Sequence, residues 1–417
     1  MKSIGLIFLA SVTAVALAAC AQTASAPGDA SNGRDSERAS AAPEAATFQE
    51  DMDFLQQHGN VEVLGREEGG RVAVSPQYQG RVMTSGVAPG GRSFGWVNRA
   101  FIETGETGTP FDNYGGEDRF WLGPEGGQYG LYFPPGRAFD LENWQVPPAL
   151  NEGTWNVEEQ TDRSITLARS MQVSNYQGTT FDLDVQRTIR MLGEGDVREH
   201  FGISPPESVD WVGFESINEV TNAGSNAWPR EGGRPSIWVL GQFETFRGAA
   251  RIVVPYDEEG SGAVVNDDYF QPLDDSRLVA DEGVIVYKAD GKYRSKIGVG
   301  PARAQAKFGS YNPEARTLTL IQYKKPEGAE AYVNSVWEKQ EQPYGGDVIN
   351  AYNDSPTDAG ESSFYELESS SPALDLAPGE SYTHPQRTLH LTGPPQALSY
   401  LMEEALGVSA GEVARAL

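Results

Sequence analysis

The sequence predicts an all-β fold of antiparallel strands, and three observations lead to this prediction. The 417 residues include 47 glycines and 26 prolines, which favour many turns. They also include 17 tyrosines, 17 phenylalanines and 8 tryptophans, which are typical of aromatic-rich strands. Helical periodicity is almost absent from residue 60 to 393, where short alternating or β-branched runs follow one another without a fixed-period repeat. This stretch therefore predicts one large β body.

The chain begins with the features of a secretory leader. Lys2 precedes an apolar stretch, residues 4–17, that is shorter than the roughly twenty residues of a membrane span. The run Leu17-Ala18-Ala19-Cys20 follows, and it resembles the lipobox of bacterial lipoproteins, in which the cysteine is lipidated. The alternative is an ordinary secreted protein with a cysteine beside its cleavage site. Cys20 is the single cysteine of the chain, so no intramolecular disulfide competes for it.

These features predict a lipoprotein signal peptide over residues 1–19 and acylation of Cys20. Ala21 rather than Asp follows the cysteine, and by analogy with lipoproteins this favours the outer membrane, with the body facing the periplasm or the cell surface. Residues 20–46 are mostly Ala, Ser, Gly and Pro with little to bury, so they predict a disordered tether.

The folded body is expected over residues 47–395, followed by a helical tail over 396–417. Thr47 and Glu50 form a capping-box pattern that predicts a short helix over 47–57, ending before Gly59. Two further helices are expected in the tail, at 396–406 and 410–417. Strands are expected at 61–64, 71–74, 81–84, 164–168, 180–192, 236–240, 251–255, 283–287, 317–323, 365–369 and 387–392.

The net charge limits the kinds of partner that the chain can bind. With 32 Lys and Arg against 59 Asp and Glu, the net charge is −27. Such a surface repels phosphate backbones, so we expect no nucleic-acid partner. It also repels anionic headgroups, so the membrane contact is expected to be a lipid on Cys20 rather than a basic patch.

The densest cluster of chemically versatile residues lies in segments 95–101 and 113–125. These segments place aromatic rings, two arginines, amides and carboxylates between glycines. Proteins bind sugars in this way, with C–H faces on aromatic rings and hydroxyls on fixed polar groups. The alternative is an aromatic core with charged residues on solvated loop edges. The cluster is equally compatible with a carbohydrate ligand and with that alternative.

Several motifs resemble the galactose-mutarotase-like (aldose 1-epimerase-like) superfamily. Asn98-Arg99 and the run from Gly115 to Trp121 resemble its Asn-Arg and Gly-Gly-His-Arg-Leu-Trp-type segments. Residues 364–372 and 376–381 resemble its late Leu-Glu strand with a following proline and its Leu-x-Pro-Gly-Glu turn. The whole chain is most similar to a group of bacterial lipoproteins in this superfamily known as a domain of unknown function. The resemblance implies a β-supersandwich of antiparallel sheets with a concave face that accommodates a sugar.

The resemblance also implies a set of site residues. Glu368 matches the glutamate that acts as general base in the epimerases, and Arg119 and Arg99 are expected to accompany it. The residues expected to bind the substrate are Asn98, Glu117, Asp118, Trp121, Asn222 and Trp228.

The histidines of the epimerases are missing from the corresponding segments. The chain has 4 histidines, and none lies in 115–121 or 215–228, where Glu117, Asp118 and several asparagines stand instead. We expect each histidine to be a surface or hydrogen-bonded residue rather than a proton donor. Two functions stay open: an enzyme of epimerase, lyase or hydrolase type with Glu368 as base, or a non-catalytic carbohydrate-binding or scaffold lipoprotein.

No cofactor is expected from the sequence. Paired histidines at metal-ligand spacing and a phosphate-binding loop are both missing. The acidic runs 266–268 and 274–275 could hold calcium, although such runs are more often solvated loops.

Overall fold

The computed structural model describes residues 45–65, 69–245, 248–355 and 364–417. The predicted signal peptide, Cys20 and most of the predicted tether lie outside the described residues. The described residues form one compact unit. Among the helices of the described residues, none is long and apolar enough to cross a membrane.

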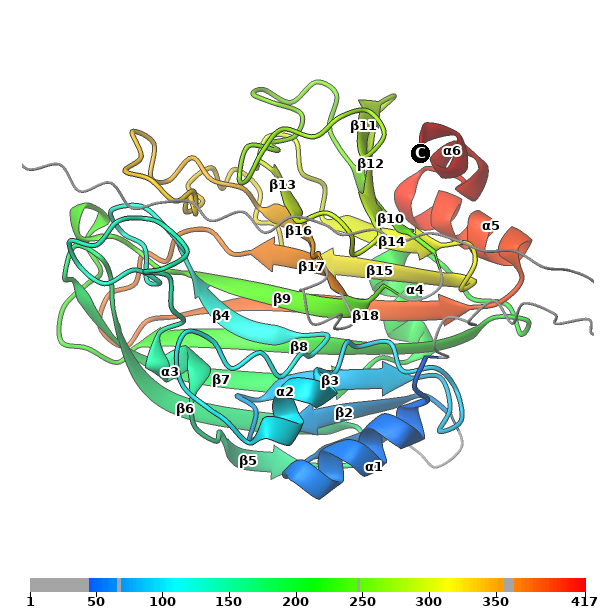
Figure 1. Cartoon of the computed structure of the whole chain (residues 1–417), viewed down its shortest axis with the longest axis horizontal. Coiled ribbons are helices and arrows are strands. Elements are labelled where there is room, and N and C mark those ends of the chain that lie inside the picture. The colour runs from blue at the N-terminus through cyan, green and yellow to red at the C-terminus, as the bar shows by residue number, and fades with distance from the viewer. Residues whose placement is uncertain (1–44, 66–68, 246–247, 356–363) are drawn as a thin grey trace, which may run out of the picture. The chain divides into compact units, whose positions relative to one another are not determined.

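Three antiparallel sheets form the compact unit (Figure 1). The three-stranded sheet runs β1 (Glu62–Gly65), β2 (Arg71–Ser75), β3 (Arg81–Gly86). The five-stranded sheet runs β13 (Ser295–Val299), β16 (Ile349–Asn353), β17 (Phe364–Ser370), β9 (Ser236–Glu244), β4 (Arg119–Gly123). The ten-stranded sheet runs β11 (Leu278–Asp281), β12 (Val284–Ala289), β10 (Ala250–Pro255), β14 (Lys307–Asn312), β15 (Thr317–Tyr323), β18 (Ser381–Thr392), β8 (Asp210–Asn222), β7 (Thr180–Met191), β6 (Ser164–Ser174), β5 (Asn156–Gln160).

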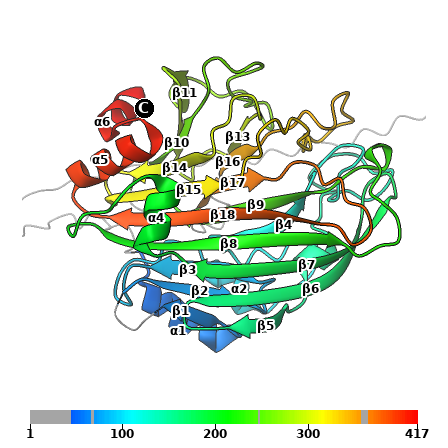
Figure 2. The ribbon, with the colours of Figure 1, turned by 180° about the vertical axis from the view of Figure 1, so that it is seen from behind.

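The two larger sheets pack face to face, and the core lies between them (Figures 1 and 2). In β7 buried and exposed residues alternate, so Phe181, Leu183 and Val185 face the core while their neighbours face solvent. One cluster joins these residues to Leu122 and Val239 of the five-stranded sheet. The predicted antiparallel β-supersandwich is therefore confirmed.

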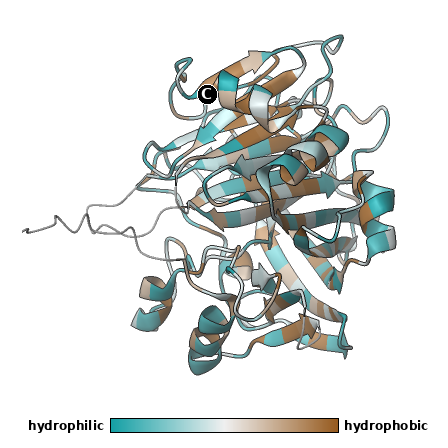
Figure 3. Cartoon of the chain, turned by 90° about the vertical axis from the view of Figure 1, so that its right-hand side faces the viewer, coloured by the Kyte–Doolittle hydropathy of each residue, from teal (hydrophilic) through white to brown (hydrophobic). Residues whose placement is uncertain are grey.

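The hydrophobic residues lie mainly along the strands of these sheets (Figure 3). Two further buried clusters lie between the short terminal helices and the sheets. Helix α1 (Phe48–His58) begins with the predicted capping box, in which the Glu50 amide donates to Thr47 Oγ1 at 3.2 Å. Helices α5 (Pro395–Leu406) and α6 (Ala410–Ala416) form the tail, and Leu398 and Leu401 lie in the same buried cluster as Leu318 and Leu320 of β15. The predicted terminal helices are thus confirmed. The remaining helices are α2 (Arg99–Thr104), α3 (Pro148–Asn151), α4 (Glu194–Phe201) and the 3-10 turn η1 (Arg230–Gly232).

Seven strands were not predicted: β4, β5, β8, β11, β13, β14 and β16. Some of them carry polar residues at buried positions, and β8 is an example, because Glu215, Asn218 and Asn222 are all buried in it. Each of these side chains has a hydrogen-bond partner from another segment, which allows it to be buried. Others, such as β5 and β11, have no buried residue and therefore show no hydrophobic alternation.

Candidate functional site

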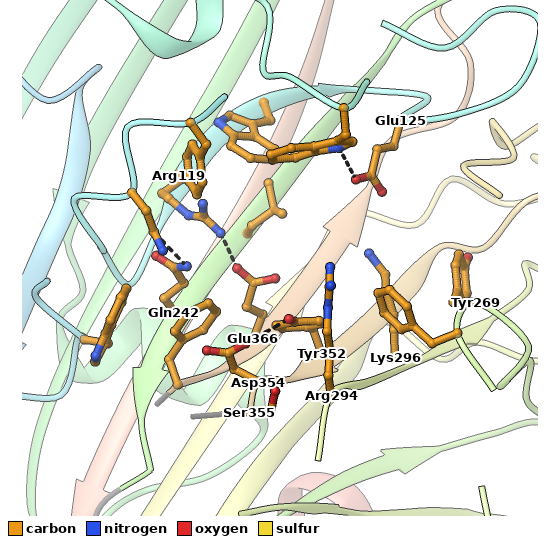
Figure 4. A pocket seen from close by; sticks show the side chains of 18 of the residues that line it. Arg119, Glu125, Gln242, Tyr269, Arg294, Lys296, Tyr352, Asp354, Ser355 and Glu366 are labelled. Atoms are coloured by element: carbon orange, nitrogen blue, oxygen red, sulfur yellow. Dashed lines mark hydrogen bonds and ion pairs between the residues drawn. The ribbon is translucent and has the colours of Figure 1, made fainter. Parts of the chain in front are cut away.

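One face of the five-stranded sheet forms the floor of a cavity of about 620 Å³, which we call the aromatic cavity (Figure 4). All five strands of the sheet contribute to its lining, together with loops that follow or precede them. The lining residues are Trp96, Asn98, Phe111, Asn113, Arg119, Trp121, Glu125, Leu141, Trp144, Trp238, Leu240, Gln242, Tyr269, Phe270, Arg294, Lys296, Trp337, Tyr352, Asp354, Ser355, Phe364 and Glu366.

Strand register places the floor residues on one face. Trp121 lies opposite Trp238, and Gln242 lies opposite Glu366. Opposed residues share a face, and residues two apart in one strand share it as well. The intervening residues, such as Val239 and Leu367, point the other way and are fully buried in the core. The sheet therefore separates a polar and aromatic cavity from an aliphatic core.

A buried ion pair joins Arg119 of edge strand β4 to Glu366 of central strand β17. The Arg119 Nη2 atom donates to Glu366 Oε1, and the guanidinium carbon lies 4.9 Å from the centre of the Trp121 ring. The Glu366 side chain keeps 12% of its surface exposed, so it can touch a ligand. Burial raises the pKa of Glu366 to about 7, although Arg119 lowers it.

A second pair joins Lys296 of the opposite edge strand, β13, to Glu368 of the same central strand. The Lys296 Nζ atom lies 3.1 Å from Glu368 Oε2, which also accepts from Trp238 Nε1 at 2.8 Å. Burial alone would lower the pKa of Lys296, but the carboxylates of Glu368, Glu125 and Glu366 outweigh it and the pKa is raised. Lys296 therefore stays protonated beside the cavity.

The loop after β4 supplies another carboxyl group to the lining. Trp144 Nε1 donates to Glu125 Oε1 at 2.7 Å, and the Glu125 amide donates to Ser335 Oγ at 3.1 Å. Burial raises the pKa of Glu125, against the lowering effect of Lys296. The indole and the loop thus hold this carboxyl group in place.

The Gly-Gly pair of the predicted motif has a backbone role. Gly115 has a φ of +89°, and a Cβ there would lie 2.1 Å from the carbonyl oxygen of Trp96. Only glycine permits this close approach, which brings Trp96 and Asn98 to the cavity beside the start of β4.

The structure brings part of the predicted site together. Asn98, Arg119 and Trp121 line the aromatic cavity. Glu368 lies on the same face of the sheet, because its Cα is opposite Leu240, which is itself opposite Arg119. Glu368 has no exposed surface, however, and it contacts Lys296 and Trp238 rather than the cavity. Its predicted role as general base stays a prediction, and the carboxyl group of this strand that faces the cavity is Glu366.

The structure places the predicted Arg99 outside the cavity. Arg99 is the first residue of α2, and its Nε and Nη2 atoms donate to Asp51 Oδ1 of α1 at 3.0 and 2.7 Å. It therefore joins two helices and does not line the aromatic cavity.

Glu117 and Asp118, both predicted to bind the substrate, are fully buried between the sheets. Glu117 Oε2 lies 3.1 Å from His390 Nε2, and Asp118 forms an ion pair with Arg187. Asp118 directly precedes Arg119, and neighbouring residues of a strand point to opposite faces of the sheet. Asp118 therefore points into the core, whereas Arg119 points into the cavity.

Asn222 and Trp228, the remaining predicted binding residues, also have structural contacts. Asn222 Nδ2 donates to the carbonyl oxygens of Asn226 at 2.8 Å and Leu376 at 2.9 Å, which closes the loop after β8. Trp228 is 4% exposed and packs edge-to-face on Phe181. Neither lines the aromatic cavity.

None of the four histidines, all of which lie in described residues, lines the aromatic cavity. His384 and His390 are fully buried rather than on the surface, and each has a hydrogen-bond partner, Ser369 Oγ and Thr319 Oγ1 respectively. His58 and His200 belong to α1 and α4.

The acidic runs considered for calcium are engaged locally. Asp267 Oδ2 accepts from the Leu273 amide at 2.7 Å, and Asp274 Oδ1 accepts from the Ser276 amide at 2.9 Å. Across residues 45–417, leaving out the three undescribed gaps, no group of three or more His, Cys, Asp or Glu residues is placed to hold a metal ion.

Sequence reasoning missed most residues of the cavity, including Glu366, Lys296, Glu125, Gln242 and Trp238. Two of them had a readable signal: Glu366 is two residues before Glu368 in a predicted strand and so shares its face, and Glu125 ends the segment 113–125 singled out for its chemistry. Lys296, Gln242 and Trp238 come from other strands that only strand pairing brings to the cavity.

Comparison with known proteins gives three findings. No curated protein matches the sequence of this chain. Solved structures with a similar fold include a candidate aldose 1-epimerase from Escherichia coli K12, with a TM-score of 0.48, 13% identity, and coverage of 80% of this chain and 99% of that one. Also similar is a galactose mutarotase related enzyme from Lactobacillus acidophilus, with a TM-score of 0.43, 11% identity, and coverage of 80% of this chain and 97% of that one. A third is a galactose mutarotase-like protein from Lactobacillus casei ATCC 334, with a TM-score of 0.43, 12% identity, and coverage of 80% of this chain and 99% of that one.

These structures are described as galactose mutarotase-like or aldose 1-epimerase-like proteins, and the similarity to them is one of structure alone. A family model matches residues 46–417 of the 417-residue chain. The chain therefore belongs to the family of unknown function designated DUF6786.

Proposed function

We propose that this protein is a cell-envelope lipoprotein that binds a carbohydrate in the aromatic cavity. One observation carries the proposal: five of the 8 tryptophans of the chain line this single cavity, namely Trp96, Trp121, Trp144, Trp238 and Trp337. Trp144 and Trp337 are half-buried, and Trp96, Trp121 and Trp238 keep 4–5% of their surface exposed. Together with amides and paired charges these rings line the cavity, which suits the C–H faces and hydroxyls of a sugar.

The polar groups of the cavity suit hydroxyl ligands better than a charged one. Two of the three cations of the lining, Arg119 and Lys296, have the carboxylate partners Glu366 and Glu368. The third, Arg294, lies 4.6 Å from the centre of the Phe270 ring. The remaining donors of the first two cations, and the amides of Asn98, Asn113 and Gln242, can each exchange hydrogen bonds with hydroxyl groups. Binding is thus the activity that the geometry supports best.

Acid–base chemistry at Glu366 is the second candidate. Its carboxyl group reaches the cavity, and a pKa of about 7 would let it exchange a proton near neutral pH. Mutarotation would require this group to take the proton of an anomeric hydroxyl while a second group protonates the ring oxygen. No histidine lines the cavity to do so, and for this reason we place binding first.

We further propose that a lipid on Cys20 holds the protein at the outer membrane. The leader, the Leu-Ala-Ala-Cys run and the polar composition of residues 21–46 support this proposal. A net charge of −27 supports a partner other than nucleic acid. No cofactor is invoked, and calcium remains a ligand to be tested by titration.

The proposal is tested by screening the full chain, purified in detergent, against an array of immobilised mono- and oligosaccharides. Trp144→Ala removes a half-buried indole of the cavity and should weaken binding of any glycan that is found by about tenfold. Trp211→Ala is the matched control, since this tryptophan is also half-buried but lies on β8 outside the cavity. Binding that survives Trp144→Ala unchanged, or an array without any bound glycan, would refute carbohydrate binding in this cavity.

Glu366→Gln separates binding from catalysis. If Glu366 transfers protons, the variant should keep its affinity while the anomeric exchange rate of the bound sugar, measured by NMR, falls to the rate in buffer. If wild type and variant show the same exchange rate, the protein is a binding lipoprotein without this activity.

A further inference from the structure

The aromatic cavity extends across the whole five-stranded sheet, and we infer that its ligand is a neutral saccharide of at least two rings. This inference rests on the proposed function and adds the size and charge class of the ligand. It is carried by the span of the cavity, its two polar ends, its apolar rim and its charge balance.

The span follows from the sheet order. Arg119 lies on β4 and Lys296 on β13, which are the two edge strands, and three strands separate them. Four inter-strand spacings of about 4.8 Å place their Cα atoms about 19 Å apart. Both side chains lean inward to carboxylates of β17, so the open space between them is shorter than this. The volume of about 620 Å³ also lies in the middle of the range for drug-sized ligands, which are larger than a monosaccharide.

Each end of the cavity has its own set of polar groups. At the Arg119 end, Glu366 pairs with Arg119, and Gln242 Nε2 donates to Asn113 Oδ1 at 3.3 Å. At the Lys296 end, Lys296 lies 5.4 Å from the centre of the Tyr269 ring, and Glu125 lies close enough to affect its pKa. Figure 4 shows Arg119 and Gln242 on one side, Lys296 and Tyr269 on the other, and Glu366 between them. Two such ends match two sugar rings.

Hydrogen-bonding capacity is left over at both ends. Arg119 Nε and Gln242 Oε1 at one end, and Glu368 Oε1 below the other, are buried without a partner among the described residues. Buried polar atoms normally have a partner, either a protein group or an ordered water. These atoms therefore indicate that both ends are completed by water or by the hydroxyls of a ligand.

The rim of the cavity includes exposed hydrophobic side chains. Two of the four large hydrophobic residues that are exposed in the described parts of the chain, Leu141 (60%) and Phe270 (41%), line this cavity. Exposed hydrophobic residues that cluster at the mouth of a pocket mark a contact surface. A ligand that reaches the mouth would cover them, whereas one ring on the floor would not.

The charges of the cavity favour a neutral ligand. Three cations, Arg119, Arg294 and Lys296, and three carboxyl groups, Glu125, Asp354 and Glu366, line it. Glu368 pairs with Lys296 and adds a further negative charge. Burial raises the pKa of Glu366 to about 7 and also raises the pKa of Glu125, so these two groups carry less than a full negative charge near neutral pH and the cavity is close to electroneutral. It therefore has no large surplus of positive charge to hold a uronate, sulfate or phosphate group, and the net charge of −27 opposes a polyanion.

The test is calorimetric titration of the full chain in detergent with the best neutral glycan from the array, with its truncations down to one ring, and with a uronate-containing glycan of equal length. We expect the two-ring ligand to bind at least tenfold more tightly than the single ring, and the uronate-containing glycan to bind more weakly than the neutral one. Trp337→Ala, which removes a lining indole beside Glu125, should reduce affinity for the two-ring ligand about tenfold and leave the single ring unaffected. Asn113→Ala at the Arg119 end is the matched variant and should weaken both ligands.

The outcomes separate this inference from the proposed function. The two-ring inference is overturned, while carbohydrate binding stands, if the protein binds one ring as tightly as two. The same holds if Trp337→Ala reduces the affinities for the one-ring and two-ring ligands equally. Tighter binding of the uronate-containing glycan overturns the neutral class. Failure of every glycan to bind overturns the proposed function itself, and the inference with it.

Discussion

Replacing Asp118 by Asn should destabilise the fold strongly without changing ligand affinity. Asp118 and Arg187 form an ion pair in which both side chains have no exposed surface. Arg187 also donates to the carbonyl oxygen of Gly80 at 2.9 Å and to Asn218 Oδ1 at 2.6 Å, and Ser216 Oγ donates to Asp118 Oδ2 at 2.9 Å. The substitution keeps the shape but leaves the guanidinium charge buried without its counter-charge.

The magnitude follows from that uncompensated charge. Removing one partner of a buried ion pair costs about 3–5 kcal/mol, whereas a surface pair contributes about 0–1 kcal/mol. Domains are stable by about 5–15 kcal/mol, so Asp118→Asn should consume a large part of the free energy of unfolding. Combining it with Arg187→Met removes both charges, so the double variant should be less destabilised than the sum of the single variants by about 2 kcal/mol.

The assay is urea unfolding followed by tryptophan fluorescence and far-ultraviolet circular dichroism, since urea does not screen charges. Asp375→Asn is the matched control, because Asp375 pairs with Arg234 at the surface with 67% of its side chain exposed. A loss below about 1 kcal/mol in Asp118→Asn, similar to that control, would refute the reasoning. Additive effects in the double variant, or a selective loss of glycan binding by a stable Asp118→Asn protein, would also contradict it.

Three further predictions concern pH and localisation. Burial raises the pKa of Glu366 from 4.5 to about 7, so between these pH values the folded state binds more protons than the unfolded state. The free energy of unfolding should therefore fall by at most about 3 kcal/mol as pH rises through this window. Glu366→Gln should remove that fall, as measured by urea unfolding at pH 5 and 7.5. Burial lowers the pKa of His384 from 6.5 to about 3, so the stabilisation from its neutral form is complete above pH 6.5 and is lost as pH falls. Between pH 7 and 5 the free energy of unfolding of the wild type should fall by about 2 kcal/mol more than that of His384→Gln. A wild-type slope equal to that of its variant would contradict either prediction. Cys20→Ser should move the protein from membrane to soluble fractions, and unchanged fractionation would argue against lipid attachment.

The sequence by itself determined the fold class, because its causes are local. Alternation of period two in residues 180–191 requires one buried and one exposed face, whatever the neighbouring strand is. The Thr47–Glu50 capping box lies within a single turn, so α1 could be placed almost to the residue. Strands such as β8 escaped prediction because their buried Glu215 and Asn218 are tolerated only through partners far away in the chain.

The site was decided by the tertiary structure. Arg119, Gln242 and Glu366 meet because β4, β9 and β17 pair in one register, and a shift of one residue would turn each side chain to the opposite face. Asp118 and Arg119 are neighbours in one motif, yet one is buried against Arg187 and the other lines the cavity. Strand pairing is a choice among distant segments that no local pattern encodes, so the sequence could name residues suited to a sugar but only the assembled sheet could select among them.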